Sequence, residues 1–98
     1  MTGPPAVVHN PGARRFEVSI GGRTAFSKYL RAGSKIVIEH TEVPEDLEGQ
    51  GLASRIVRAA LEFARDEKLS VIPLCPFTAA FIRRHPEFQD LVEEGYRY

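Results

Sequence analysis

The strongest chemical signal in the sequence is a short segment with two glycines, Glu48-Gly49-Gln50-Gly51-Leu52-Ala53. It lies between a β-branched stretch and a stretch with helical periodicity. Glycines allow unusual backbone angles and the close approach of a ligand. Free N–H groups at a helix start, together with the helix dipole, favour an anion. The segment therefore suits a pyrophosphate group, although the same glycines could serve only a tight turn, since Gly-x-Gly alone is weak evidence.

Cys75 is the only cysteine of the chain. One cysteine excludes an intrachain disulfide framework and a multi-cysteine metal site, and we expect no metal. Cys75 directly precedes Pro76, a residue that suits the first turn of a helix. A helix N-terminus can lower the pKa of a thiol and raise its thiolate fraction. Cys75 is therefore a candidate nucleophile or proton donor, and the alternative is a buried cysteine that packs as a small hydrophobic side chain.

His40 is the second candidate for chemistry. A neutral imidazole could remove a proton from an ammonium group near pH 7. Strand alternation places His40 with Ile36 and Ile38, so it could instead be a packed histidine. Glu39 and Glu42 are rival carboxylate bases, and the alternative for both is a solvated strand face.

The composition is that of a small globular protein, with 98 residues, 43% of them hydrophobic and 27% charged. Thirteen Lys and Arg balance thirteen Asp and Glu, so no net basic field would attract nucleic acid. No apolar run approaches the roughly 20 residues that span a bilayer. The first residues lack a signal-peptide pattern, and we expect a cytoplasmic protein without membrane contact. A chain this short buries only about 60–65% of its unfolded surface, so a homodimer could add stability.

Residue periodicity predicts three antiparallel strands in the first half of the chain. Residues 1–13, which include three prolines, are predicted to be a flexible leader. Alternating apolar residues predict strands over residues 16–20 and 24–31, joined by a Gly21-Gly22 hairpin turn. Residues 35–43 are rich in β-branched side chains and predict the most clearly formed strand.

The second half predicts a helix, a strand and a helix. Helical periodicity begins at Leu52 and fades at Asp66, residues 70–75 predict a buried strand, and a second helix runs from Pro76 to Pro86. A strand, a helix and a strand predict a crossover between parallel neighbours. The predicted fold class is α/β, a three-stranded antiparallel meander followed by α-β-α, in one domain over residues 14–98. The aromatic side chains expected in the core are Phe16, Phe26, Phe63, Phe77 and Phe81.

The glycine segment resembles the coenzyme A pyrophosphate loop of the GCN5-related N-acetyltransferases, whose pattern is Gln/Arg-x-x-Gly-x-Gly/Ala. Gly51 and Ala53 match its Gly and Gly/Ala positions, and Gly49 and Gln50 fit the common Arg-Gly-x-Gly form. Glu48 stands where the family has Gln or Arg. The run from Cys75 to Pro86 resembles a subgroup of very short members, and the whole resemblance covers roughly residues 14–92.

This resemblance implies an acyl-CoA N-acyltransferase-like fold in which the strands over 35–43 and 70–75 splay apart at their ends. It implies acetyl-CoA as cosubstrate, with the pantetheine arm paired to backbone near Glu42 and Val43. The N–H near Val43 could also polarise the thioester carbonyl. The implied reaction transfers an acetyl group to an amine, which a protein could carry because so short a chain leaves the cleft open. The residues implied to hold the pyrophosphate are Gly49, Gln50, Gly51, Leu52 and Ala53.

Two departures from the family bear on the mechanism. The usual acid of the family is a tyrosine on the last helix, and Arg83 stands at that position. The helices that larger members insert after the first strand are absent. With the tyrosine replaced, Cys75 could accept the acetyl group covalently or donate the proton. Two alternatives remain, a module that binds acetyl-CoA or CoA without turnover, and a structural or interaction domain.

Overall fold

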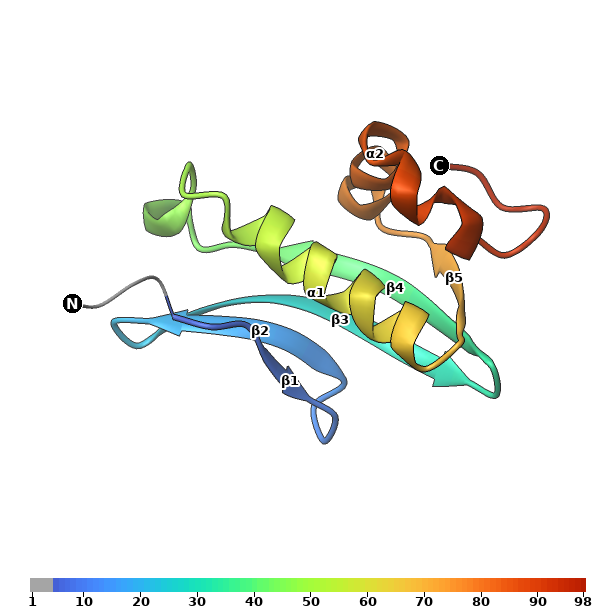
Figure 1. The fold of residues 1–98 in the computed structure, drawn as a ribbon. Helices are drawn as coiled ribbons and strands as arrows, with labels where there is room; N and C mark the ends of the chain where they lie inside the picture. The colour runs from blue at the N-terminus through green and yellow to red at the C-terminus, as the bar shows by residue number, and fades with distance from the viewer. Residues whose placement is uncertain (1–4) are drawn as a thin grey trace.

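The computed structural model describes residues 5–98 and contains one five-stranded mixed sheet with helices (Figure 1). The strands lie in the order β1-β2-β3-β4-β5; the first four are antiparallel and β5 is parallel to β4. The mixed α/β sheet and the parallel crossover are therefore confirmed. In chain order, the elements are β1 (Val8–Asn10), β2 (Arg15–Ile20), β3 (Arg23–Ala32), β4 (Lys35–Glu42), η1 (Glu45–Leu47), α1 (Leu52–Asp66), β5 (Ser70–Pro73), α2 (Pro76–Arg84) and η2 (Pro86–Leu91).

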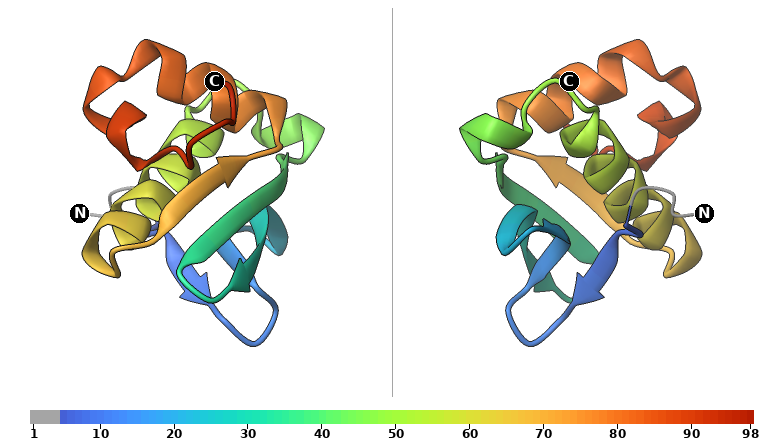
Figure 2. Two further views of the ribbon diagram at one scale, coloured as in Figure 1. Left: turned by 90° about the vertical axis from the view of Figure 1, so that its right-hand side faces the viewer. Right: turned by 90° about the vertical axis from the view of Figure 1, so that its left-hand side faces the viewer.

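Helix α1 lies along one face of the sheet, while α2 and η2 gather beside β5 (Figure 2). The apolar stripe of α1 is buried against the inward residues of the strands, as an amphipathic helix requires. The predicted helix face is confirmed at Leu52, Ile56 and Ala60, while Ala59 and Phe63 pack at its margin. The inward apolar residues of the strands are Phe16, Val18, Ala25, Tyr29, Ile36, Ile38 and Val71.

The segment predicted to be a loose leader contains a strand, so this prediction is wrong for residues 8–10. Residues 1–4 lie outside the described part of the chain. In β1, His9 is paired with Phe16 of β2. The His9 ring stacks on Phe16 with a centroid distance of 4.2 Å, and its Nε2 lies 2.6 Å from the Tyr29 hydroxyl. These contacts with β2 and β3, rather than local periodicity, position β1.

Strand β4 contains a β-bulge that changes which side chains face inward. Lys28 of β3 pairs with His40 and Tyr29 pairs with Ile38, so Glu39 is an extra residue without a partner in β3. The alternation therefore reverses after Ile38. The prediction that His40 lies with Ile36 and Ile38 is wrong, because His40 is exposed while both isoleucines are buried.

Phe26 of β3 is a second correction. It was expected in the core, but the inward residues of this strand are Ala25, Ser27 and Tyr29. Phe26 is half-buried on the opposite face, where the Arg15 guanidinium lies 4.6 Å from the centre of its ring. A phenylalanine can remain on the outer face when a cationic side chain covers its ring. Of the other expected core aromatics, Phe63 and Phe77 are only partly buried.

The C-terminal segment covers the outer edge of β5. Strand β5 ends at Pro73, two residues earlier than predicted, and α2 begins at Pro76 as expected. After η2, Val92 forms a parallel bridge with Val71, and the Glu93 N–H donates to the Val71 carbonyl at 2.8 Å. The Glu93 carboxylate also lies 3.4 Å from Lys35 Nζ. Within residues 5–98, none of the helices combines the length and the apolar character needed to cross a membrane.

Candidate functional site

Strands β4 and β5 run side by side for four residue pairs and then part, as expected. The ladder extends from Lys35 opposite Ser70 to Ile38 opposite Pro73. Pro73 has no N–H, so it cannot donate the next ladder bond. The Cys75 N–H makes a last link to the Ile38 carbonyl at 3.0 Å. Beyond it β4 continues to Glu42, paired with β3 but no longer with β5. This leaves space between β4 and the start of α2.

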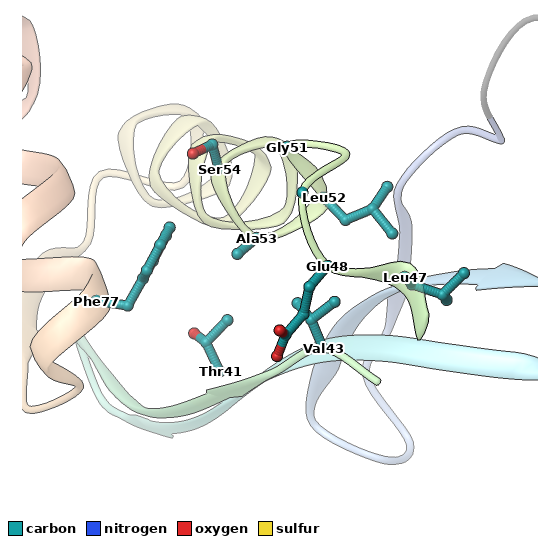
Figure 3. A pocket seen from close by; sticks show the side chains of 10 residues that line it. Thr41, Val43, Leu47, Glu48, Gly51, Leu52, Ala53, Ser54 and Phe77 are labelled. Carbon is teal, nitrogen blue, oxygen red and sulfur yellow. The ribbon is translucent and has the colours of Figure 1, made fainter. Parts of the chain in front are cut away.

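A cavity of about 340 Å³ occupies this region (Figure 3). Its walls come from the end of β4, the loop that contains η1, the first turn of α1 and the first turn of α2. The lining is mainly apolar, with two hydroxyl groups and one carboxylate, which is typical of a small-molecule site. The residues that line it are Thr41, Val43, Leu47, Glu48, Gly49, Gly51, Leu52, Ala53, Ser54 and Phe77.

The loop before α1 presents uncapped backbone to this cavity. Gly49 and Gly51 have φ of +85° and +75°, a region that favours glycine. Gly51 is the N-cap of α1, and no side chain makes a capping hydrogen bond there. A Cβ atom built on either glycine would meet no heavy atom within 4 Å, so the space beside the loop is open. Because the first N–H groups of a helix lack partners within the helix, this turn can hold an anion.

Glu48 is the one carboxylate among the residues that line the cavity. In Figure 3 its side chain points toward Val43 of the β4 side and away from the first turn of α1. A negative charge close to a bound anion would weaken binding by repulsion. Because the Glu48 carboxylate is directed away from the helix N-terminus, this repulsion is reduced there. Ser54 adds a hydroxyl to the cavity wall.

The predicted binding residues are only partly brought together. Among them, Glu42 and Gln50 are exposed and do not line the cavity. Thr41 and Ser54 were not predicted, and Phe77 was assigned to the core. Thr41 was missed because simple alternation after Ile38 gives it the wrong face, whereas Ser54 carried no signal beyond its place one turn into a helix. The predicted residues that do line the cavity are Val43, Gly49, Gly51, Leu52 and Ala53.

Cys75 lies one side chain away from the cavity. It is only 3% exposed, and its Sγ–H donates to Thr41 Oγ1 at 3.5 Å. The Thr41 hydroxyl in turn donates to Ser27 Oγ at 3.1 Å. Burial has the largest single influence on the thiol and raises its pKa, but Thr41, Thr78 and the Phe77 backbone are placed to stabilise the thiolate form and lower it. Together these groups prevail, and the pKa of Cys75 lies below its ordinary value.

His40 is not brought to Cys75 or to the cavity. Its exposed ring lies beside Phe26, and its Nε2 is 3.2 Å from Glu42 Oε1. Both side chains belong to the outward set of β4, opposite to Thr41 and Val43. The described residues contain no group of three or more His, Cys, Asp or Glu side chains placed to hold a metal ion.

The chain is similar to known proteins in sequence and in fold. Residues 15–91 match a family model described as GCN5-related N-acetyl-transferase. Protein NATD1 of Mus musculus is 33% identical over 87 residues, which are 86% of this chain and 79% of that protein. Protein NATD1 of Homo sapiens is 33% identical over 86 residues, 85% of this chain and 76% of that protein.

A solved structure shares the fold. The NMR solution structure of a GCN5-like protein from Staphylococcus aureus superposes with a TM-score of 0.65 at 25% sequence identity. The match covers 87% of this chain and 89% of that chain. The family model spans more than three quarters of the sequence and includes both the glycine loop and Cys75. Sequence and fold therefore agree that the chain belongs to the GCN5-related N-acetyltransferase family.

Proposed function

We propose that this protein binds acetyl-CoA and transfers its acetyl group to an amine. The observation that carries the proposal is the uncapped N-terminus of α1, which opens through Gly49 and Gly51 into the cavity where β4 and β5 part. The family generally uses acetyl-CoA. The uncapped helix N-terminus would suit its pyrophosphate, and the cavity between the parted strands would suit its extended thioester arm. Open space on the Cβ side of both glycines supports the fit, because a ligand can approach the backbone there.

The loop residues of this chain would hold the coenzyme through the backbone. The N–H groups at Gly51 to Ala53 would donate to the pyrophosphate, and the Ser54 hydroxyl lines the same wall. The backbone at Glu42 and Val43 would pair with the arm, and an N–H there would stabilise negative charge that develops on the thioester oxygen. When bound, acetyl-CoA supplies an activated acetyl group. The amine must lose its proton to attack, so a base or a water chain completes the site.

Cys75 would take part in the transfer from its place beside Thr41, the residue that joins its thiol to the cavity. Two roles remain open. As an acid, Cys75 would give its proton through the Thr41 hydroxyl to the departing thiolate. As a nucleophile, its thiolate would form a bond to the acetyl carbon while the bond from that carbon to the coenzyme sulfur breaks. The amine would then displace Cys75 and release the acetylated product.

The acceptor would be a bulky amine, such as one on a protein. A two-residue turn joins β2 to β3, so no inserted helix stands there to enclose the acceptor side. Specificity for a small amine needs a walled pocket that surrounds it. An open acceptor side suits a protein substrate, whose own surface would cover the cleft when its amine enters.

Two measurements test this function. Calorimetry should show acetyl-CoA and CoA binding in the micromolar range, on the order of a metabolite site. Incubation with acetyl-CoA and a panel of amines that includes lysine peptides should release CoA and yield acetylated product. Absence of binding would contradict the proposal. Binding without transfer to any amine would support the alternative, a non-catalytic coenzyme-binding module, which the replacement of the family tyrosine by Arg83 favours.

A further inference from the structure

Thr78 carries an unusual polar group. Thr78 is fully buried, at 0% exposure, yet its Oγ1 has no hydrogen-bond partner. Most buried polar groups in proteins are hydrogen-bonded, because a buried hydroxyl without a partner loses its water and gains nothing in return. Among the described residues Arg55 Nη1 is also buried without a partner, but the rest of that guanidinium is bonded through Nη2, whereas the single hydroxyl of Thr78 has no bond at all. The hydroxyl of Thr78 therefore calls for a function that the resting structure does not show.

The position of Thr78 relates it to Cys75. Cys75 is the N-cap of α2, and Thr78 is the third residue of that helix. An N-cap side chain faces the N–H groups of the second and third helical residues, here Phe77 and Thr78. In the structure the Cys75 side chain makes no capping hydrogen bond, because its S–H is directed to Thr41. A thiol sulfur is a weak acceptor, whereas a thiolate is a strong one.

The surroundings of the sulfur therefore suit a negative charge that the resting thiol does not carry. The groups that act on the pKa of Cys75, besides burial, are the Thr41 side chain from β4 and, from α2, the backbone of Phe77 and both the backbone and the side chain of Thr78. All of them are uncharged. A thiolate here would be stabilised by hydrogen-bond donors rather than by a cationic partner.

We propose that Thr78 is a positioning residue for Cys75, whose buried hydroxyl turns to donate to the sulfur once the thiol ionises. The S–H proton leaves through Thr41, which lines the cavity, and no electron is transferred. The hydroxyl would hold the sulfur in place while it is charged, and would regain in that state the partner it lacks at rest. Any contribution of the Thr78–Cys75 pair to turnover rests on the proposed acetyl transfer. The hydrogen bond from Thr78 to the ionised sulfur is proposed independently of that function.

The test compares Thr78→Val, which removes the hydroxyl at nearly constant shape, with Thr78→Ser, which retains it. The thiol is titrated in the full chain without coenzyme, by its thiolate absorbance. Cys75→Ala supplies the baseline that subtracts the tyrosines. Thr78→Val should raise the thiol pKa by about one to two units, and Thr78→Ser should stay close to the parent. The same Thr78→Val chain should unfold at a higher temperature, by about 5 °C, because a buried group without a partner has been removed.

Thr78→Val is thus expected to make the thiolate less stable and the folded chain more stable. A merely structural role of Thr78 would not change the thiol pKa in this way. An unchanged thiol pKa in Thr78→Val overturns the proposal. A raised pKa in both variants overturns it as well, because the serine retains the donor. A lower unfolding temperature in Thr78→Val would show that the hydroxyl already has a partner at rest, and would also overturn it. Because every measurement is made without acetyl-CoA, failure of coenzyme binding would leave these results unaffected and would count only against the proposed function.

Discussion

Replacement of Gly51 by alanine separates the role of the loop in folding from its role in binding. Gly51 is the N-cap of α1 and has φ of +75°. An added methyl group would point into open space in the free protein, since no heavy atom lies within 4 Å of it. It would nevertheless stand where a ligand has to approach the first N–H groups of the helix.

The expected magnitudes follow from these two effects. A residue with a side chain in the left-handed region costs about 1–2 kcal/mol, and each kcal/mol lowers the unfolding temperature of a domain this size by about 4–8 °C. For binding, the loss of one hydrogen bond to a charged group costs about 1.5–3 kcal/mol. Since about 1.4 kcal/mol is a factor of ten, Gly51→Ala should weaken the Kd for CoA roughly 10- to 100-fold.

The matched control is Gly22→Ala in the turn between β2 and β3. Gly22 has φ of +80° and likewise no heavy atom within 4 Å of an added Cβ, but it does not line the cavity. Calorimetry with CoA and thermal unfolding are measured on both variants. Both should lose similar stability, and only Gly51→Ala should lose affinity. An unchanged Kd in Gly51→Ala, or an equal loss in both variants, would refute the view that this loop cradles the coenzyme.

Three further predictions concern single side chains. Cys75→Ala should lower kcat of acetyl transfer by about tenfold or more while the Kd for acetyl-CoA changes little, and a fully active variant would make Cys75 a packing residue. His40→Ala should leave kcat/KM nearly unchanged because the ring lies on the outer face, so a large loss would contradict this placement. Burial, with a smaller contribution from Arg31, lowers the pKa of His9 below its ordinary 6.5. The unfolded chain then binds the proton first, so the unfolding temperature should fall as the pH drops through about 6.5, and His9→Phe should flatten that fall.

The glycine loop could be predicted from the sequence because its signal is local. The residues from Gly49 to Ala53 are contiguous, and a strand before them and a helix after them are both visible in the periodicity. The core face of α1 was predictable for the same reason. Cys75 was found because it is the only cysteine and precedes a proline. The contact of Cys75 with Thr41, which links it to the cavity, could not be predicted because Thr41 lies 34 positions earlier in the chain.

The errors arise where tertiary contacts overrule a local period. The bulge at Glu39 reverses the alternation of β4, and so it exchanges His40 for Thr41 on the cavity side. No composition signal distinguishes a bulged glutamate from a paired one. Strand β1 escaped prediction because three residues are too few to show a period, and its position depends on contacts of His9 with Phe16 and Tyr29.

The segment that follows η2 also limits how this molecule can associate. An open edge strand offers its N–H and C=O groups to any neighbouring chain. At Val71 the outer edge of β5 is already occupied by Val92 and Glu93. A second chain could extend the sheet there only by displacing that segment, so the three-residue β1 is the more accessible edge. Truncation of the chain after Leu91 would expose the outer edge of β5 to pairing with another molecule. A C-terminal purification tag that displaces Val92 and Glu93 would have the same effect.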